Sequence, residues 1–272
     1  MTPVDLDPAG RVWAEGGHDV GVLVLSGSSG RVEVDRCRVL ADAGATASSV
    51  RWFGGPGQRP TLDRVPLESF EEPLAALHER CERLVVLGAS RGAEVALLLG
   101  AMHPEISAVV GLSPSHVVWA ALDVARPQRS SWTLEGRALP FVPYDDEWET
   151  ATDPPELVTL YEHCLTAYAD RVPAARIAVE RIAGRVLLAA GGDDRLWPSV
   201  DMADEIAHRR EHAGLDTTVV THREAGHRVV LPGEPTVRPR RDLAHGGTAA
   251  ADRELGAQVW PELLDVLGLP QA

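Results

Sequence analysis

Short apolar runs alternate with longer segments of helical periodicity along most of the chain. The runs that predict strands are each followed by turn residues, and they lie at 20–25, 45–52, 84–87, 107–112, 184–190 and 217–221. The helical patterns lie at about 32–43, 67–82, 91–102, 198–213 and 248–267. Because strands that alternate with helices form βαβ units, the pattern predicts an α/β fold, with a mostly parallel central sheet and helices on both faces.

The alternation is interrupted between about residues 115 and 172, where seven of the chain's thirteen aromatic residues lie. A long insertion between the strands of a sheet often forms a lid or a binding loop. We therefore predict a single domain over residues 1–272, in which the segment 115–172 is a lid that shapes an apolar pocket. The alternative is a helical decoration with a small core of its own.

A G-x-S-x-G pattern, Gly88-Ala89-Ser90-Arg91-Gly92, lies between the strand predicted at 84–87 and the helix predicted at 91–102. A serine between a strand and a helix, flanked by glycines, is typical of a nucleophile elbow, in which the backbone turns sharply and exposes the hydroxyl. The simpler interpretation is an ordinary turn with a solvated serine. The strand before the pattern and the helix after it favour the catalytic interpretation.

A serine nucleophile needs a neighbouring base, and the base needs a carboxylate that orients it. His227 follows the last predicted strand, and Asp194 follows the strand at 184–190, so both lie in loops at the carboxyl ends of strands. The order Ser90, Asp194, His227 is the one expected when nucleophile, acid and base are carried on such a sheet. Asp193 competes with Asp194, because the sequence leaves open which of the two adjacent carboxylates meets the histidine.

The other histidines fit catalysis less well. His222 lies at an exposed or edge position of a strand, and His103 lies at a helix end before Pro104. His208 and His212 are spaced i, i+4, as in some metal sites, but charged neighbours on the same helix indicate a solvated face. We therefore predict no metal site.

The composition narrows the possible chemistry and the partners. The chain has no lysine, which excludes Schiff-base chemistry, a Ser-Lys dyad and a Walker A loop. The net charge of −14 argues against a nucleic-acid partner. Three scattered cysteines, the absence of an N-terminal signal pattern and the absence of a membrane-length apolar run predict a cytoplasmic protein that makes no membrane contact.

Acyl transfer also needs hydrogen-bond donors for the oxyanion. One is expected to be the backbone N–H of Arg91, because it follows the nucleophile. The second is expected from the loop after the first predicted strand, where the backbone N–H groups of Ser28 and Ser29 are the candidates. The side chains of Arg91 and of the arginines at 238, 240 and 241 are expected at the solvated surface rather than on a substrate phosphate.

Five segments of the chain resemble the C-terminal catalytic domain shared by acyl-CoA thioesterases and bile-acid-CoA:amino-acid N-acyltransferases. This family belongs to the α/β-hydrolases and is similar to dienelactone hydrolases. The segments are Gly88-Ala89-Ser90-Arg91-Gly92-Ala93-Glu94, Leu112-Ser113-Pro114-Ser115-His116-Val117-Val118-Trp119, Gly191-Gly192-Asp193-Asp194-Arg195-Leu196-Trp197-Pro198-Ser199, Ala225-Gly226-His227 and His245-Gly246-Gly247-Thr248. The resemblance runs from about residue 20 to residue 268.

The resemblance implies an α/β-hydrolase fold and favours Asp194 over Asp193 as the acid. Bile-acid transferases have a cysteine at the position of Ser90, so the serine here resembles the hydrolytic members. Mammalian members carry an additional N-terminal β-sandwich domain that 272 residues do not accommodate, so we expect a different substrate range.

The matching segments also contain candidate pocket residues. By their place at strand ends, Ser115, His116, Trp119 and Trp197 are candidates to line the substrate pocket. The alternative is that they pack as an ordinary strand end.

Together these observations predict a serine acyl hydrolase that acts on an acyl thioester through an acyl-enzyme. The alternatives are hydrolysis of a carboxylic ester or lactone, acyl transfer to an amine or alcohol, and a non-catalytic binding protein of the same fold. No bound cofactor is expected, because coenzyme A or the pantetheine of an acyl carrier protein would be part of the substrate.

Overall fold

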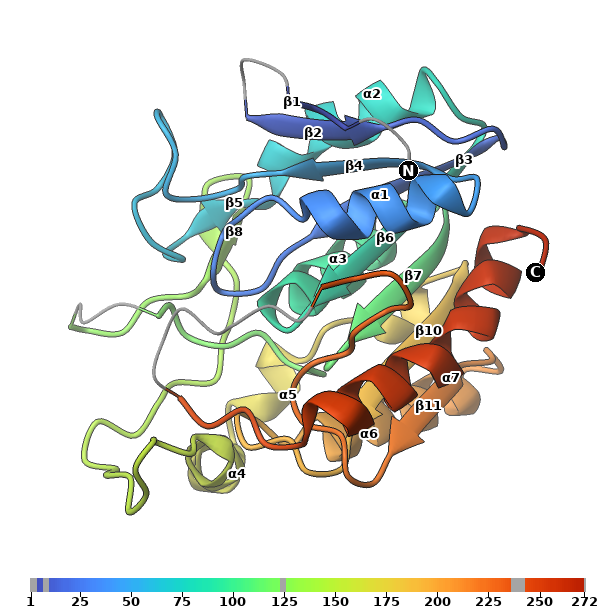
Figure 1. Ribbon diagram of the computed structural model, residues 1–272. Coiled ribbons are helices and arrows are strands. Elements are labelled where there is room, and N and C mark those ends of the chain that lie inside the picture. Colours follow the sequence, from blue (N-terminus) through green and yellow to red (C-terminus); the bar gives the residue numbers. More distant parts are fainter. Residues whose placement is uncertain (1–3, 7–9, 123–125, 236–242, 272) are drawn as a thin grey trace.

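The computed structural model describes residues 4–6, 10–122, 126–235 and 243–271. An eight-stranded sheet runs through its centre in the order β1-β2-β4-β3-β6-β7-β10-β11 (Figure 1). The strands are β1 (Asp5–Leu6), β2 (Arg11–Ala14), β3 (Val20–Leu25), β4 (Thr46–Val50), β6 (Arg83–Ala89), β7 (Ile106–Leu112), β10 (Arg185–Gly191) and β11 (Thr218–His222). The pairs β1–β2 and β2–β4 are antiparallel, and all later neighbours are parallel.

Helices cover both faces of this sheet, as the sequence predicts. They are α1 (Val34–Asp42), α2 (Glu71–His78), α3 (Arg91–Met102), α6 (Ser199–His212) and α7 (Ala249–Leu267). The helices α1 and α7 pack in one buried cluster on one face, whereas α2, α3 and α6 pack in a second cluster on the other (Figure 1). The expected α/β architecture is therefore confirmed.

The alternation of side chains along the strands explains how one sheet supports two cores. On β3, Val20, Val22 and Val24 belong to the cluster beneath α1 and α7. Leu23 and Leu25 belong to the opposite cluster. Because every residue of β3 is buried, the strand reads as a continuous apolar run rather than as alternating apolar and polar residues.

One predicted helix is shorter than the sequence indicates. The segment 67–82 forms a 3₁₀ turn, η1 (Leu67–Phe70), followed by α2, which ends at His78. Pro73 lies in the first turn of α2, where its missing N–H has no intrahelical bond to lose. This proline favours a helix that begins at Glu71 rather than one that continues from Leu67.

The insertion at 115–172 forms a structure with its own packing. Its strands β8 (Trp132–Leu134) and β9 (Arg137–Ala138) join β5 (Val65–Pro66) in a second, three-stranded sheet. The helix α4 (Val158–Ala167) follows, and after it come α5 (Val172–Ala175) and η2 (Val179–Arg181). A separate buried cluster forms around Trp119, Tyr161 and Trp197.

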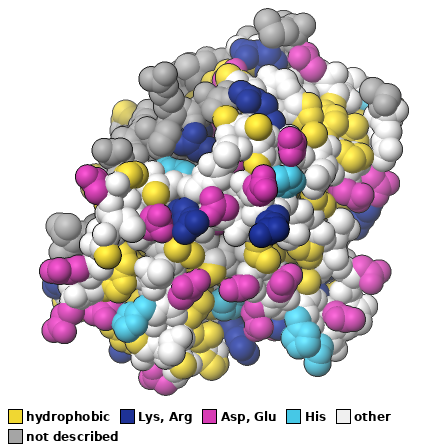
Figure 2. Space-filling model, turned by 60° about the horizontal axis from the view of Figure 1, so that its bottom comes forward, with side chains coloured by type: hydrophobic (Ala, Val, Ile, Leu, Met, Phe, Trp, Pro, Cys, Tyr) yellow, Lys and Arg dark blue, Asp and Glu magenta, His cyan; other side chains and the backbone are white. Residues whose placement is uncertain are grey.

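The surface carries charges of both signs. Figure 2 shows acidic side chains spread over one face of the molecule, with arginines lying between them. Within the described residues, no helix combines the length and the apolar character that a membrane span requires.

Candidate active site

Ser90 lies at a sharp turn between β6 and α3. Its φ of 56° and ψ of −119° are unusual for a residue with a side chain, and such strain persists only where the surroundings enforce it. Its backbone N–H donates to the carbonyl of Leu112 at 2.8 Å. A Cβ on Gly88 would lie 1.9 Å from the carbonyl oxygen of Gly92, and one on Gly92 would lie 2.4 Å from that of Leu25. The turn therefore requires both glycines.

Asp194 and His227 meet at the carboxyl edge of the sheet. Asp194 follows β10 and His227 follows β11, and His227 Nδ1 lies 2.8 Å from Asp194 Oδ2. The other carboxylate oxygen accepts the backbone N–H groups of Leu196 at 2.8 Å and Trp197 at 3.2 Å. Because an ionised carboxylate can only accept hydrogen bonds, Nδ1 carries the proton and Nε2 is left as a base.

The two acids left open by the sequence have different partners. One oxygen of Asp193 accepts the backbone N–H of Gly247 at 2.8 Å, and the other accepts Nε of Arg195 at 2.7 Å. Asp193 therefore holds two loops together, while Asp194 orients the histidine. Of the two adjacent carboxylates, Asp194 is the one that meets His227.

The other histidines that the sequence offers as candidates contact different partners. His222 lies 3.2 Å from Glu254, and His103 lies 3.0 Å from Glu105 and 3.2 Å from Glu71. His208 and His212 contact each other on α6, with ring centroids 4.2 Å apart. Among the described residues, no three His, Cys, Asp or Glu side chains gather as metal ligands.

The candidate oxyanion donors lie beside Ser90. The backbone N–H groups of Ala93 and Glu94 donate to the Ser90 carbonyl, whereas Arg91 supplies the first N–H of α3, which an α-helix leaves without an intrahelical acceptor. Ser28 and Ser29 line the same cavity as Ser90. The backbone between β3 and α1 approaches closely, because a Cβ on Gly27 would lie 3.1 Å from the Cβ of Ser90.

The side chain of Arg91 is buried, so the expectation of a solvated arginine was wrong. Its guanidinium lies 2.7 Å from Glu94 and donates to the carbonyl of Ala120 at 3.0 Å. The physical reason is that the insertion covers the start of α3 and supplies acceptors there. The arginines at 238, 240 and 241 lie outside the described residues.

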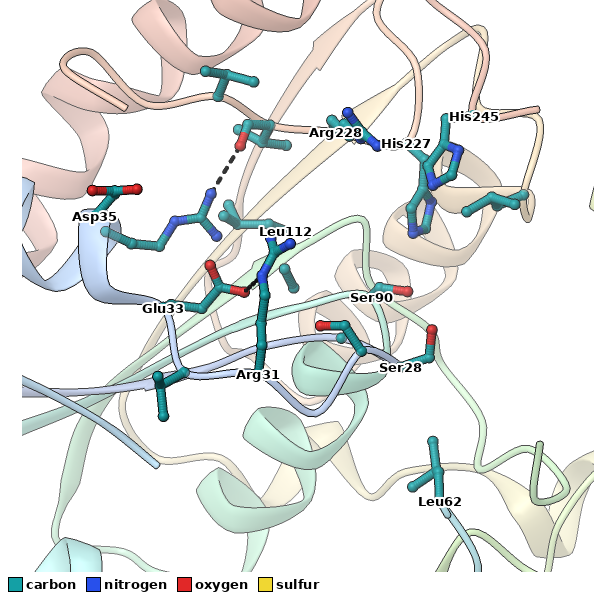
Figure 3. Close-up of a pocket in the computed structure, with 18 of the residues that line it drawn as sticks. Ser28, Arg31, Glu33, Asp35, Leu62, Ser90, Leu112, His227, Arg228 and His245 are labelled. Carbon is teal, nitrogen blue, oxygen red and sulfur yellow. Dashed lines mark hydrogen bonds and ion pairs between the residues drawn. The ribbon is translucent and has the colours of Figure 1, made fainter. Parts of the chain in front are cut away.

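Ser90 and His227 both line a cavity of about 710 Å³ (Figure 3). Its apolar wall includes Phe53, Leu62 and Leu122. A charged wall lies on the other side of Ser90. In Figure 3, Leu62 marks the apolar wall and Arg228 marks the charged wall. Ser90 therefore lies between an apolar and a charged region of the cavity.

The charged wall contains paired groups. Its members are Arg31, Glu33, Asp35, Arg36, Arg228 and Glu234. Arg31 lies 3.0 Å from Glu33, and Arg36 lies 2.5 Å from Glu234. Burial lowers the pKa of Arg228, and the charge of Asp252 opposes this shift. This wall suits the polar part of a substrate rather than a hydrocarbon chain.

The four candidate pocket residues lie in the packed interior and not among the side chains that line this cavity. The Ser115 hydroxyl accepts Trp119 Nε1 at 2.9 Å and donates to the Val117 carbonyl. His116 is buried, and burial, aided by two arginines, lowers its pKa to about 4. Trp197 packs against the His227 ring at a centroid distance of 5.6 Å. Of the four, Trp197 contacts the proposed base directly, while Ser115, His116 and Trp119 are buried in the interior.

The insertion contributes little to the cavity itself. Of the residues 115–172, Leu122 is the one that lines it in the described structure. Several others form a separate buried cluster, and the carbonyl of Ala120 accepts a hydrogen bond from Arg91. The geometry thus favours the alternative interpretation, a decoration with its own core.

Sequence reasoning missed several lining residues. Phe53 and Leu62 lie in or after the turn that follows β4, at the carboxyl edge where ligands bind in such sheets. His245 also lines the cavity, and it belongs to a segment that the family resemblance already singled out. The signal for Phe53 and Leu62 was their position after a strand, and the signal for His245 was the matching segment.

The strand order, the serine elbow and the acid–histidine pair define an α/β-hydrolase. The chain belongs to the BAAT / acyl-CoA thioester hydrolase C-terminal family, whose model matches residues 65–267. The name of this family refers to the hydrolysis of acyl-CoA thioesters.

A curated relative and several solved structures are similar to the chain. It is 24% identical over 254 residues to the bile acid-CoA:amino acid N-acyltransferase of Mus musculus. That match covers 89% of this chain and 58% of the mouse protein, so the chain spans little more than half of its relative's length.

The structural similarities concern the fold. A puromycin-hydrolyzing peptidase of Mycobacterium tuberculosis has a TM-score of 0.60 at 18% identity, with 99% of this chain and 40% of that chain covered. A Klebsiella pneumoniae protein assigned as a dienelactone hydrolase has a TM-score of 0.56 at 14% identity, with 98% of each chain covered. A dienelactone hydrolase-like promiscuous phosphotriesterase from metagenomic libraries has a TM-score of 0.53 at 17% identity, covering 96% of this chain and 92% of that one.

Proposed function

We propose that the protein is a serine hydrolase of acyl thioesters that works through an acyl-enzyme on Ser90. The observation that carries the proposal is the contact of 2.8 Å between Asp194 and His227 beside a cavity that Ser90 also lines. Family membership supports acyl chemistry, and the serine favours water as the final acceptor. We further propose that the protein acts in the cytoplasm on acyl groups carried by coenzyme A or by an acyl carrier protein.

In the first half-reaction, His227 Nε2 removes the proton of the Ser90 hydroxyl while the oxygen attacks the thioester carbonyl. Asp194 stabilises the imidazolium that forms. The backbone N–H groups of Arg91 and of Ser28 or Ser29 stabilise the oxyanion, each worth about 3 kcal/mol of barrier. His227 then protonates the departing thiol, and the acyl group stays on Ser90.

In the second half-reaction, water enters where the thiol has left. His227 takes one proton from water while its oxygen attacks the acyl carbon. The bond to Ser90 Oγ breaks, and His227 returns the proton to the serine. The products are the free acid and the regenerated enzyme.

The walls of the cavity suggest how the substrate lies. His227 must contact the leaving atom, so the leaving group extends along the His227 side, where the charged wall lies. The acyl group then lies against Phe53, Leu62 and Leu122. This orientation suits a hydrocarbon acyl chain on a polar carrier.

The first experiment tests the nucleophile. A serine-directed fluorophosphonate should label the protein, and Ser90→Ala should abolish labelling while the circular dichroism spectrum stays unchanged. An unlabelled parent protein, or a Ser90→Ala variant that is still labelled, would contradict the proposal.

The second experiment tests the substrate class. Turnover of an acyl-CoA panel is compared with turnover of p-nitrophenyl esters of the same acyl groups. We expect higher kcat/KM for the thioesters. Rapid ester turnover with little thioester turnover would instead identify an ester or lactone hydrolase.

Acyl transfer is the second candidate, favoured by the similarity to the mouse N-acyltransferase. Adding an amino acid such as glycine to the acyl-CoA reaction and analysing the products by mass spectrometry tests it. An amide product in excess of the free acid would assign the protein to acyl transfer.

A further inference from the structure

A second histidine borders the cavity in which Ser90 and His227 lie. His245 lines the same wall as His227, and the two ring centroids are 6.1 Å apart (Figure 3). His245 has no role in either of the two proposed half-reactions. It also begins the segment His245-Gly246-Gly247-Thr248, which has no role in those steps either.

The hydrogen bonds of His245 fix its tautomer. Its Nδ1 lies 2.9 Å from the carbonyl oxygen of Leu243. Because a carbonyl oxygen only accepts, Nδ1 carries the proton and Nε2 holds a lone pair. Burial lowers the pKa of His245, the hydrogen bond to Leu243 opposes this shift, and His227 and Arg228 add to it, which favours the neutral ring. The ring lines the cavity, and its Nε2 is not engaged by the Leu243 carbonyl that occupies Nδ1.

The backbone holds His245 in a fixed place relative to the acid and the base. Its carbonyl accepts the N–H of His227 at 2.8 Å. Gly246 and Gly247 have φ values of 68° and 63°, and a Cβ on Gly246 would lie 1.6 Å from the carbonyl oxygen of Asp193. This segment thus packs directly against the loops that carry Asp194 and His227.

We propose that Nε2 of His245 accepts a hydrogen bond from the nucleophile that deacylates Ser90, and thereby favours nucleophiles with a second hydrogen. The inference rests on the proposed acyl-enzyme. Water and primary amines carry two hydrogens, of which His227 removes one and His245 binds the other. An alcohol carries one hydrogen, which goes to His227.

The proton balance is the same as in the proposed second half-reaction. The nucleophile's oxygen or nitrogen forms a bond to the acyl carbon, and the bond to Ser90 Oγ breaks. One proton moves from the nucleophile to His227 and then to Ser90. His245 neither gains nor loses a proton, so its effect is to orient the nucleophile.

The experiment measures how one acyl-enzyme divides between two acceptors. A p-nitrophenyl ester acylates the protein in buffer that contains methanol, and the methyl ester and the free acid are quantified. For His245→Phe we expect the ratio of methyl ester to acid to rise about fivefold to tenfold, as loss of one neutral hydrogen bond to water implies. The pre-steady-state burst of nitrophenol, which reports acylation, should change less than about twofold.

Two variants serve as controls. His245→Gln supplies an amide oxygen that can accept the same hydrogen bond, and should restore most of the parent ratio. His208→Phe removes an exposed histidine on α6 and should leave the ratio unchanged. A product ratio is independent of the amount of folded protein, so general damage to the structure does not imitate the effect.

The outcomes separate the two proposals. A His245→Phe ratio equal to that of the parent would overturn the role of His245. A parent protein that gives neither a burst nor fluorophosphonate labelling would contradict the acyl-enzyme itself, and the inference with it.

Discussion

Arg91 and Glu94 form an ion pair of 2.7 Å inside the protein, with side chains that are 1% and 0% exposed. Arg91 also donates to the carbonyl of Ala120 and to the hydroxyl of Tyr144. Glu94 accepts Trp132 Nε1 at 2.5 Å. All three of these partners belong to the insertion, so the pair ties the first turn of α3 to that segment. Burial raises the pKa of Glu94, although Arg91 opposes the shift.

Glu94→Gln should destabilise the protein by about 3–5 kcal/mol, because the Arg91 cation remains buried without its counter-ion. Chemical denaturation measures this free energy of unfolding. The double variant Arg91→Met with Glu94→Leu removes both charges and should be much closer to the parent. If Glu94→Gln alone were as stable as the parent, the ion pair would not be important for the fold.

The glycines of the elbow allow a second prediction. A Cβ on Gly92 would lie 2.4 Å from two backbone oxygens of the β3 end, those of Leu25 and Ser26. Gly92→Ala should therefore lower the melting temperature and the rate of fluorophosphonate labelling together, because β3 or the elbow must move. Gly17→Ala is the matched control, since its Cβ would meet nothing within 4 Å. Equal melting temperatures for the two variants would refute the steric argument.

The sequence predicts the inner strands well because they are buried on both faces. The strand β3 reads as six apolar or small residues, and the structure gives it the predicted bounds. The strand β2 was missed because Arg11 and Trp13 are partly exposed while Val12 and Ala14 are buried. A period of two over four residues is too short to separate from a loop.

The meeting of Asp194 with His227 was predictable, because position on the sheet decides it. Ser90, Asp194 and His227 each follow a strand, and the structure brings Asp194 to His227. The burial of Arg91 was not predictable, because charged residues are rarely buried and its partners in the insertion lie 29 and 53 residues further along the chain. The i, i+3 spacing of Arg91 and Glu94 was a local signal for an ion pair that the sequence-based prediction did not use.

Asp194→Asn should lower kcat about 10⁴-fold, because an amide can hold His227 in the wrong tautomer. The fold should survive, since Asn can still accept the N–H of Leu196. Steady-state kinetics on the best thioester measures the effect. The control is Asp193→Asn, whose carboxylate binds Gly247 and Arg195 instead, and which should retain activity within about tenfold. A larger loss for Asp193→Asn than for Asp194→Asn would reverse the assignment of the acid.

Leu122→Trp should shorten the acyl chain that the enzyme accepts, because Leu122 lines the apolar wall beside Leu62. We expect kcat/KM to fall at least about tenfold for long acyl chains and to change little for acetyl. A series of acyl-CoA substrates of increasing length checks this. Leu165→Trp, on α4 and not at the cavity, should leave the chain-length profile as it is. A uniform loss over all lengths would place the acyl group elsewhere.

His116 should make stability depend on pH. Burial, aided by Arg176 and Arg209, lowers its pKa to about 4, below the ordinary value of about 6.5. Between these values the unfolded chain binds a proton that the folded protein does not, so the free energy of unfolding falls as pH drops from 6.5 to 4. The loss amounts to about 3 kcal/mol, and His116→Gln should remove it. Urea titrations at pH 7 and pH 4 measure the difference between variant and parent, with the exposed His208→Gln as control. A difference that stays constant between the two pH values would show that His116 is protonated equally in the folded and unfolded states.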